Sequence, residues 1–316
     1  MKSLLRIGTR GSRLALWQAN WVKDQIKAYH KNITVELIPI KTRGDKILDV
    51  PLAKVGGKGL FVKEIEDALL KDEIDLAVHS MKDVPTDLPS GLIIGAITRR
   101  EDIRDALVSR KGKPLTELPA GARVGTSSLR RGAQIKHYRP DVEIVPIRGN
   151  LETRLKKIES LDISAVVVAA AGMHRLGLSA LITEYLSFDL CLPAIGQGAI
   201  GIEWREDDRE TESMLSFLNH LPTAQAVQSE RAFLKVLEGG CQVPIACMGQ
   251  VEGEEILLEG MVADIAGTRL IRGSLKGPVF EGERLGGELA RALLSRGALE
   301  ILKEVYGRDD YGKKGR

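Results

Sequence analysis

Aromatic residues and net charge are both scarce in this chain of 316 residues. Phe, Trp and Tyr together make up 4% of it, and 46 Lys and Arg against 43 Asp and Glu leave a net charge of +3. Proteins that hold nucleic acid need aromatic rings for base stacking or a strong excess of positive charge. Both shortages argue against a nucleic-acid partner, so any basic region must be a local site.

Long apolar runs are also missing. The longest, at residues 163–173, is about half as long as a helix that crosses a bilayer. The first thirteen residues carry three arginines and one lysine without the apolar core of a secretory signal. We therefore expect a cytoplasmic protein that does not bind membranes. Its length predicts two or three domains.

Only three cysteines are present, Cys191, Cys241 and Cys247. Their spacing gives neither a metal-binding pair nor an even disulfide set, which is typical of a reducing compartment, and no metal site is expected. Cys191 and Cys247 have apolar neighbours and are predicted to be buried thiols. Cys241 follows two glycines at the end of a predicted helix, where a bulky group can approach the backbone. It is the best nucleophile candidate.

Short β-like runs alternate with helical ones in the first two thirds of the chain. Strands are predicted at 4–7, 35–40, 76–78 and 92–97, and helices at 14–29 and 60–70. This pattern predicts a parallel-rich α/β sheet with helices on both faces. The tetrapeptide Arg6-Ile7-Gly8-Thr9 recurs as Arg123-Val124-Gly125-Thr126. Four residues can recur by chance, but the shared strand, turn and helix context favours two similar domains.

The last third has a different rhythm, with strands predicted at 245–252, 256–263 and 269–276 and a helix at 285–305. We predict the α/β class, with two similar doubly wound domains joined by a hinge, as in periplasmic-type binding proteins, and a small C-terminal α+β domain with a three-stranded antiparallel sheet. The predicted domains are residues 1–98 with 194–218, residues 99–193, and residues 219–316.

Arginines follow several of the predicted strands. The loop at residues 8–13 contains Arg10 and begins a helix, and the repeat at 125–131 has the same arrangement. Helix starts attract anions, and arginine binds carboxylates in a bidentate manner. Arg148, Arg154 and Arg175 follow further strands, at the ends where α/β sheets bind ligands. The alternative is a solvated charged surface, with Ser12 as an ordinary helix cap.

Lys82 and Asp83 follow the predicted strand at 76–78. A carboxylate beside a lysine at a strand end remains ionised and serves in proton transfer, although a plain surface ion pair is the simpler interpretation. Lys58 lies between glycines, in a loop that either covers the site as a lid or is only a surface loop.

Six motifs together resemble the porphobilinogen deaminase family: Gly-Thr-Arg-Gly-Ser-Arg-Leu-Ala-Leu-Trp-Gln-Ala at 8–19, His-Ser-Met-Lys-Asp-Val-Pro-Thr at 79–86, Gly-Thr-Ser-Ser-Leu-Arg-Arg at 125–131, Arg-Gly-Asn at 148–150, Gly-Gln-Gly-Ala at 196–199 and Gly-Gly-Cys at 239–241. They occur in the same order as in the family and span nearly the whole chain. The resemblance implies a dipyrromethane cofactor on Cys241, attached through a thioether. It also implies that four porphobilinogens are added to this primer, each losing ammonia, before water releases 1-hydroxymethylbilane.

The resemblance also implies the roles of individual residues. The catalytic residues would be Asp83 and Lys82, and the lid would contain Lys58. The cofactor would be bound by Cys241, Ser12, Lys82, Asp83, Thr126, Ser127, Ser128, Arg130, Arg131, Arg148, Gly149 and Gly198. The substrate would be bound by Arg10, Arg148, Arg154, Arg175, Gln18, Ala169 and Gln197. The implied partner is porphobilinogen, with no nucleic acid and no membrane, and we expect a monomer.

The chemistry of the implied substrate agrees with the arginines. Each pyrrole brings two carboxylates, which need positive charge around them once water is excluded. The main alternative is a non-catalytic anion-binding protein of the hinged two-domain type, which requires export and leaves Cys241 without a task.

Overall fold

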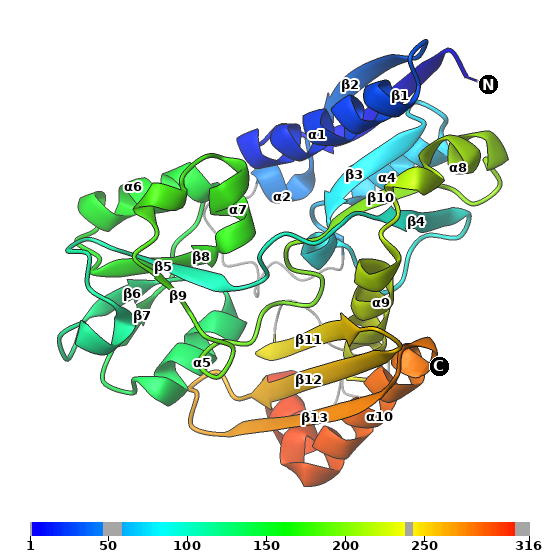
Figure 1. The fold of residues 1–316 in the computed structure, drawn as a ribbon. Helices are drawn as coiled ribbons and strands as arrows, with labels where there is room; N and C mark the ends of the chain where they lie inside the picture. Colours follow the sequence, from blue (N-terminus) through cyan, green and yellow to red (C-terminus); the bar gives the residue numbers. More distant parts are fainter. Residues whose placement is uncertain (1, 47–58, 238–242, 307–316) are drawn as a thin grey trace.

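A computed structural model describes residues 2–46, 59–237 and 243–306. Two units of the chain contain a five-stranded sheet and a third contains a three-stranded sheet (Figure 1). The strands of the first sheet are β1 (Leu4–Arg10), β2 (Thr34–Ile40), β3 (Leu76–Ser80), β4 (Leu92–Ile97) and β10 (Ile200–Arg205). Those of the second are β5 (Asp105–Ser109), β6 (Arg123–Gly125), β7 (Glu143–Val145), β8 (Ala165–Ala169) and β9 (Glu184–Tyr185).

The two large sheets have the same topology. Their strand orders are β2-β1-β3-β10-β4 and β7-β6-β8-β5-β9. In each sheet the first three strands are parallel, and the fourth is antiparallel to both neighbours. The first copy of the repeated tetrapeptide lies in β1, and the second covers β6 and the residue after it; the two strands occupy equivalent places. The structure therefore confirms the predicted repeat of two similar units.

The expected parallel-rich sheets are mixed, because the chain passes twice between the two units. It leaves the first sheet after β4 and begins the second with β5, and it returns after β9 to insert β10 between β3 and β4. Both inserted strands run against their neighbours. The first sheet therefore contains four strands that precede the second unit in the sequence and one, β10, that follows it. The domain limits given above remain a prediction.

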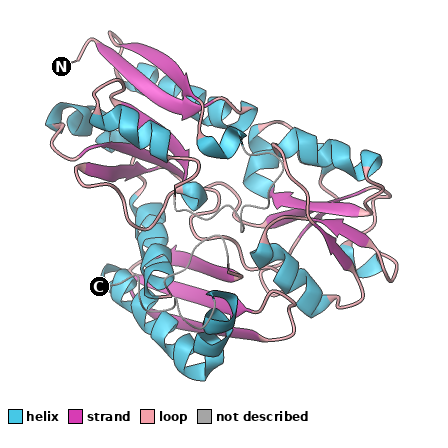
Figure 2. Cartoon of the chain, turned by 180° about the vertical axis from the view of Figure 1, so that it is seen from behind, coloured by secondary structure: helices cyan, strands magenta, loops and turns pink. Residues whose placement is uncertain are grey.

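Helices cover both faces of the large sheets (Figure 2). Helix α1 (Arg13–Tyr29) shares an apolar cluster with Leu76 and Val78 of β3, whereas α4 (Lys63–Leu70) shares one with Ala77. Alternate residues of a strand point to opposite faces, so the two helices lie on opposite sides. In the second unit the helices are α5 (Leu129–Tyr138), α6 (Leu151–Ser160) and α7 (Ala170–Arg175).

The third unit is the predicted antiparallel sheet, with strands β11 (Ile245–Glu252), β12 (Glu255–Ala263) and β13 (Leu270–Pro278). Its helices are α9 (Leu221–Val236), α10 (Gly282–Leu293) and α11 (Leu299–Tyr306), and α8 (Arg209–Leu215) precedes them. The single helix predicted at 285–305 is wrong. Gly297 has φ +108°, a left-handed conformation that interrupts the helix between α10 and α11.

A buried carboxylate ties the crossing segments to the third unit. Glu230 of α9 accepts hydrogen bonds from Arg100 Nη1 at 2.6 Å, from Gly196 N at 2.7 Å and from Gly249 N at 2.8 Å. These partners lie in the first crossing, in the second crossing and in β11. One side chain therefore holds the three units together where the chain passes between them. Within the described ranges, no helix has both the length and the apolar character needed to span a bilayer.

Candidate active site

The expected site residues gather at the carboxyl ends of parallel strands. Arg10 ends β1, and the 3-10 turn Met81–Asp83 directly follows β3. In the second unit, Thr126, Ser127 and Ser128 follow β6, Arg148 and Gly149 follow β7, and Ala169 ends β8. Because parallel strands end at one edge of a sheet, each large sheet presents its set of residues on one side.

Lys82 links the residues at the strand ends of the first sheet to those of the second. It follows β3 in the first unit, yet it interacts electrostatically with Arg130, Arg131 and Asp105 of the second unit. Burial and then the charge of Arg131 lower the pKa of Lys82 to about 8, against the effect of Asp83 and Asp105. Burial is the larger cause, and the neighbouring arginine charges act in the same direction.

Asp83 is exposed and lies among cations. Its charge acts on Lys82, its neighbour, and on Arg154 of α6 in the second unit. Burial, together with the charges of Arg131 and Arg148, lowers the pKa of Arg154 to about 10, against the effect of Asp83. Asp83 is therefore an accessible carboxylate at the meeting point of the two units.

Asp105, in β5, organises the two adjacent arginines of α5. Its carboxylate accepts hydrogen bonds from Arg130 Nη1 at 2.7 Å, from Arg131 Nη2 at 2.7 Å and Nε at 3.0 Å, and from Gln197 Nε2 at 2.9 Å. The Asp105 side chain is fully buried, and both arginine side chains are 6% exposed. Burial alone raises the pKa of Asp105, but the charges of Arg130 and Arg131 hold it well below its usual value. The cluster therefore keeps one excess positive charge.

The hydroxyl groups after β6 shape the loop that leads into α5. Thr126 Oγ1 accepts from Ser128 N at 3.2 Å, Ser128 Oγ caps the helix by accepting from Arg131 N at 3.4 Å, and Ser127 Oγ donates to the Ile147 carbonyl at 2.6 Å. The loop after β7 requires glycine at position 149, where φ is +110° and a Cβ would lie 2.6 Å from Thr153 Cγ2.

Arg175, at the end of α7, reaches back to the second crossing. Its Nη2 donates to the Gly198 carbonyl at 2.6 Å, and its guanidinium lies 5.8 Å from the centre of the Trp17 ring on α1. Burial lowers the pKa of Arg175 to about 10. Gly198 has φ +87°, and a Cβ there would lie 2.5 Å from the Glu101 carbonyl oxygen. Position 198 therefore requires glycine, because the backbone there lies too close to the Glu101 carbonyl for a side chain.

Arg10 is paired within its own unit. Its Nε donates to Asp45 Oδ1 at 3.2 Å, its Nη2 also contacts Oδ1, and its guanidinium lies 4.3 Å from the centre of the Phe61 ring. Burial raises the pKa of Asp45, but the hydrogen bonds from Arg10 and Thr42 outweigh it and lower the pKa. In this structure Asp45 occupies the carboxylate position that the resemblance gives to a substrate.

Three further expected residues are Ser12, Gln18 and Gln197. Ser12 caps α1 by accepting from Ala15 N at 3.3 Å, as in the simpler interpretation of its role. Gln18 and Gln197 are buried, and Gln18 Nε2 and Gln197 Oε1 have no hydrogen-bond partner among the described residues. Each of these two atoms still has the capacity for a hydrogen bond, while Gln197 Nε2 donates to Asp105 and to the Ile103 carbonyl.

The cysteines divide as predicted where they are described. Cys191 and Cys247 are both buried. Burial and the charge of Asp105 raise the pKa of Cys191 to about 12, and burial with Glu230 raises that of Cys247 well above its ordinary value. Neither is a thiolate at neutral pH. Cys241 and Lys58 lie outside the described residues.

Two acidic residues of the site were missed from the sequence. Asp105 and Asp45 each neutralise an arginine expected to bind an anion. Asp105 begins the apolar run Asp-Ala-Leu-Val at 105–108, and a carboxylate at the start of a buried strand signals a buried counter-ion. Asp45 has no such signal.

The residues fit a group with several carboxylates. The interacting cluster contains the cations Lys82, Arg130, Arg131, Arg148 and Arg154 and the carboxylates Asp83 and Asp105. Its positive charge exceeds its negative charge, and burial already lowers the pKa of Lys82 and Arg154. Anionic groups bound here would offset the repulsion between these cations.

Comparisons with known proteins agree with these features. The family model "Porphobilinogen deaminase, dipyromethane cofactor binding domain" matches residues 5–213, and "Porphobilinogen deaminase, C-terminal domain" matches residues 224–295. The porphobilinogen deaminases of Geobacter metallireducens and Geobacter sulfurreducens are 58% and 57% identical over 305 residues, 96% of this chain and of each relative. The solved methionine-binding protein MetQ aligns with a TM-score of 0.43 at 16% identity, over 72% of this chain and 91% of its own. With both matched parts in order and more than half of its residues identical to such relatives, the chain belongs to the porphobilinogen deaminase family.

Proposed function

We propose that this protein is a hydroxymethylbilane synthase, a transferase of tetrapyrrole biosynthesis. It joins four porphobilinogen molecules head to tail on a covalently bound dipyrromethane and then releases the linear product with water. The observation that supports this best is the cluster of buried and half-buried cations around the accessible Asp83 in a chain of this family. The non-catalytic anion-binding alternative is not favoured, because the matching relatives are named as deaminases.

The cofactor's carboxylates would be held by Lys82, by the Arg130–Arg131 pair that Asp105 orients, and by Arg148, with Ser12, Gly149, Gly198 and the hydroxyl groups of the α5 loop alongside. When bound through Cys241, the dipyrromethane supplies the pyrrole carbon on which the chain grows. Arg10, Arg154, Arg175, Gln18, Gln197 and the Ala169 backbone would bind the acetate and propionate groups of incoming porphobilinogen. Lys58 would belong to a loop over this site.

Asp83 would be the catalytic carboxylate, with Lys82 beside it. Porphobilinogen loses ammonia when its aminomethyl C–N bond breaks, and the nitrogen keeps the bonding electrons. The methylene-pyrrole that remains is a cation, and a fixed carboxylate near its N–H stabilises that charge. The same carboxylate then accepts the proton that leaves when the new carbon–carbon bond forms.

The remaining proposals concern the setting of the enzyme. The division into residues 1–98 with 194–218, 99–193 and 219–316 is supported by the strands that each sheet contains. We propose that the enzyme works as a monomer in the cytoplasm, since its biosynthetic role needs neither nucleic acid nor a membrane.

The covalent cofactor is tested by the intact mass of the purified protein. We expect an excess over the sequence mass equal to two linked pyrrole units, and we expect the Cys241→Ser variant to lack it because no other thiol is available for the thioether. The Cys191→Ser variant is the control, since that buried thiol should not affect the excess. An unmodified wild-type mass, or an excess that survives in Cys241→Ser, would contradict the proposal.

Lys82 reports whether the cofactor's carboxylates lie beside it. In the cofactor-free Cys241→Ser protein we expect its side chain to titrate near pH 8, as burial and Arg131 dictate. In the cofactor-loaded protein the added carboxylates should raise this pKa. NMR titration of lysine labelled at Cε measures both values, Lys82→Arg assigns the signal, and Lys27→Arg on the surface of α1 is the control. The same pKa in both proteins would place the carboxylates elsewhere.

A further inference from the structure

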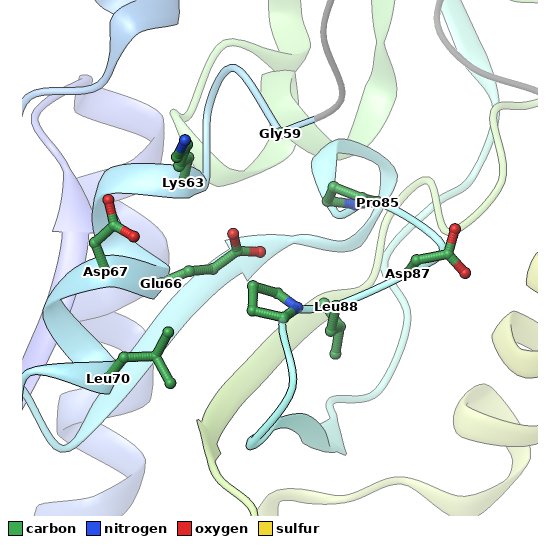
Figure 3. A pocket seen from close by; sticks show the side chains of 9 residues that line it. Gly59, Lys63, Glu66, Asp67, Leu70, Pro85, Asp87 and Leu88 are labelled. Atoms are coloured by element: carbon green, nitrogen blue, oxygen red, sulfur yellow. The ribbon is translucent and has the colours of Figure 1, made fainter. Parts of the chain in front are cut away.

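A cavity of about 290 Å³ lies between α4 and the segment that follows Asp83 (Figure 3). It is lined by Gly59, Lys63, Glu66, Asp67, Leu70, Pro85, Asp87, Leu88 and Pro89. Its lining side chains include three carboxylates and one ammonium group, and Asp87 is also paired with Lys235 at 3.5 Å, so the negative charge of the wall is concentrated on Glu66 and Asp67. That sign is opposite to the cationic cluster around Lys82, so the cavity is suited to a different kind of ligand.

Glu66 is the residue that marks this cavity as a site. It is only 6% exposed, and its Oε1 has no hydrogen-bond partner within the described part of the chain. Figure 3 shows its carboxylate pointing from α4 toward the segment that carries Pro85 and Leu88. A buried carboxylate oxygen without a partner is costly, and a bound cation would remove that cost.

A second buried carboxylate lies behind Glu66. Glu203 of β10 contacts His79 Nε2 through Oε2 at 2.8 Å, while its Oε1 has no partner among the described residues. Burial and then the charge of Glu203 raise the pKa of Glu66 to about 7, against the effect of His79. Glu203 also interacts with the charge of Arg231, whereas Glu66 Oε1 has no hydrogen-bond partner among the described residues. A positive charge beside Glu66 is therefore favoured.

The residues that line the cavity also indicate which kind of ligand it can hold. Among the described residues no group of three His, Cys, Asp or Glu side chains is placed to hold a metal ion. The cavity suits a small monovalent cation that donates hydrogen bonds, as an ammonium ion does. Porphobilinogen also has an amine, but its two carboxylates would be repelled by Asp67 and Asp87.

The cavity also adjoins the catalytic segment. Pro85 and Asp87 belong to its wall and follow Asp83 closely. Arg231 of α9 fixes this stretch by donating to the carbonyls of Val84 at 3.1 Å, Pro85 at 2.5 Å and Thr86 at 3.2 Å. A cation leaving the vicinity of Asp83 would therefore find the Glu66 cavity next to its origin.

We propose that this cavity binds an ammonium ion, with the Glu66 carboxylate as its charged ligand. The choice of ammonium over other small cations rests on the proposed function, because each addition of porphobilinogen releases ammonia, which is protonated at neutral pH as other amines are. Glu66 thus holds the co-product away from the cationic cluster where the next substrate binds.

Urea unfolding of the cofactor-loaded enzyme tests the site without relying on turnover. Ammonium chloride is compared with tetramethylammonium chloride and potassium chloride at equal ionic strength. At ammonium concentrations ten times the dissociation constant, the folded-to-unfolded ratio should rise about elevenfold over the tetramethylammonium control. The gain should be larger at pH 8 than at pH 6, because binding requires ionised Glu66. The other titratable or charged groups around it are Lys63, Asp67, His79, Asp87, Glu203 and Arg231.

The matched variants are Glu66→Gln, which should lose the ammonium effect, and Glu36→Gln on exposed β2, which should keep it. An equal effect in Glu66→Gln, none in the wild type, or an equal effect with potassium would overturn the proposal. If Glu66→Gln does not fold, broadening of the ¹⁵N-ammonium NMR signal by the wild-type enzyme, or its absence, decides the matter. Synthesis of hydroxymethylbilane is assayed separately, so saturable ammonium binding without synthesis would refute the proposed function alone.

Discussion

Asp83→Asn is expected to lower the rate of hydroxymethylbilane formation by about two orders of magnitude or more while the protein stays folded. Asp83 is exposed, so loss of its charge should cost little stability. Its carboxylate nevertheless lies between Lys82 and Arg154, at the meeting point of the two large units. An amide of the same size keeps the shape of the site but neither stabilises the methylene-pyrrole cation nor accepts its proton.

Three measurements distinguish loss of catalysis from unfolding and from loss of the cofactor. Initial rates give turnover, urea unfolding gives stability, and intact mass shows whether the cofactor is complete in the variant. Asp24→Asn, on the exposed surface of α1, is the control for loss of one carboxylate. Near-normal turnover by a cofactor-loaded Asp83→Asn protein would remove Asp83 from the mechanism.

Most of this site was predictable because parallel strands place successive loops together. The positions of Arg10, Asp83, Thr126 and Arg148 after short apolar strands were sufficient to predict a shared edge in each sheet. The repeat at 6–9 and 123–126 predicted that two such edges exist. That Lys82 meets Arg131 across the two units was the step that required coordinates.

The rest depends on contacts between residues far apart in sequence. Asp45 binds Arg10 from 35 residues away, and Gln197 reaches Asp105 from 92 residues away. No local pattern encodes such pairs. The antiparallel direction of β10 was hidden for the same reason, since a strand's sequence gives its exposure pattern but not its direction.

The break in the C-terminal helix has a local cause that periodicity concealed. Apolar residues recur at helical spacing through 285–305, but Gly297 adopts a left-handed conformation and divides the segment. A glycine near the middle of a periodic run is compatible with either outcome. Here φ is +108°, and a Cβ at this position would lie 3.3 Å from Ile271 Cδ1 of β13, so the conformation favours glycine.

Asp105→Asn is expected to lower the free energy of unfolding by about 3–5 kcal/mol, because it leaves two buried guanidinium groups without their carboxylate. The matched control is Asp102→Asn, which weakens a more exposed pair with Arg104 and should cost at most about 1 kcal/mol. Urea unfolding in the cofactor-free Cys241→Ser background measures both.

The pH dependence of that loss identifies its origin. Arg130 and Arg131 hold the pKa of Asp105 well below its unfolded value, despite burial. The stability it contributes is therefore fully present above its ordinary pKa of about 4 and is lost as pH falls through the depressed folded value. The difference between wild type and Asp105→Asn should shrink on acidification, while a loss caused only by altered packing would not change with pH. A constant difference from pH 7 to pH 3 would mean that Asp105 acts through its shape and not as the counter-charge that holds the two arginines in position for an anionic ligand.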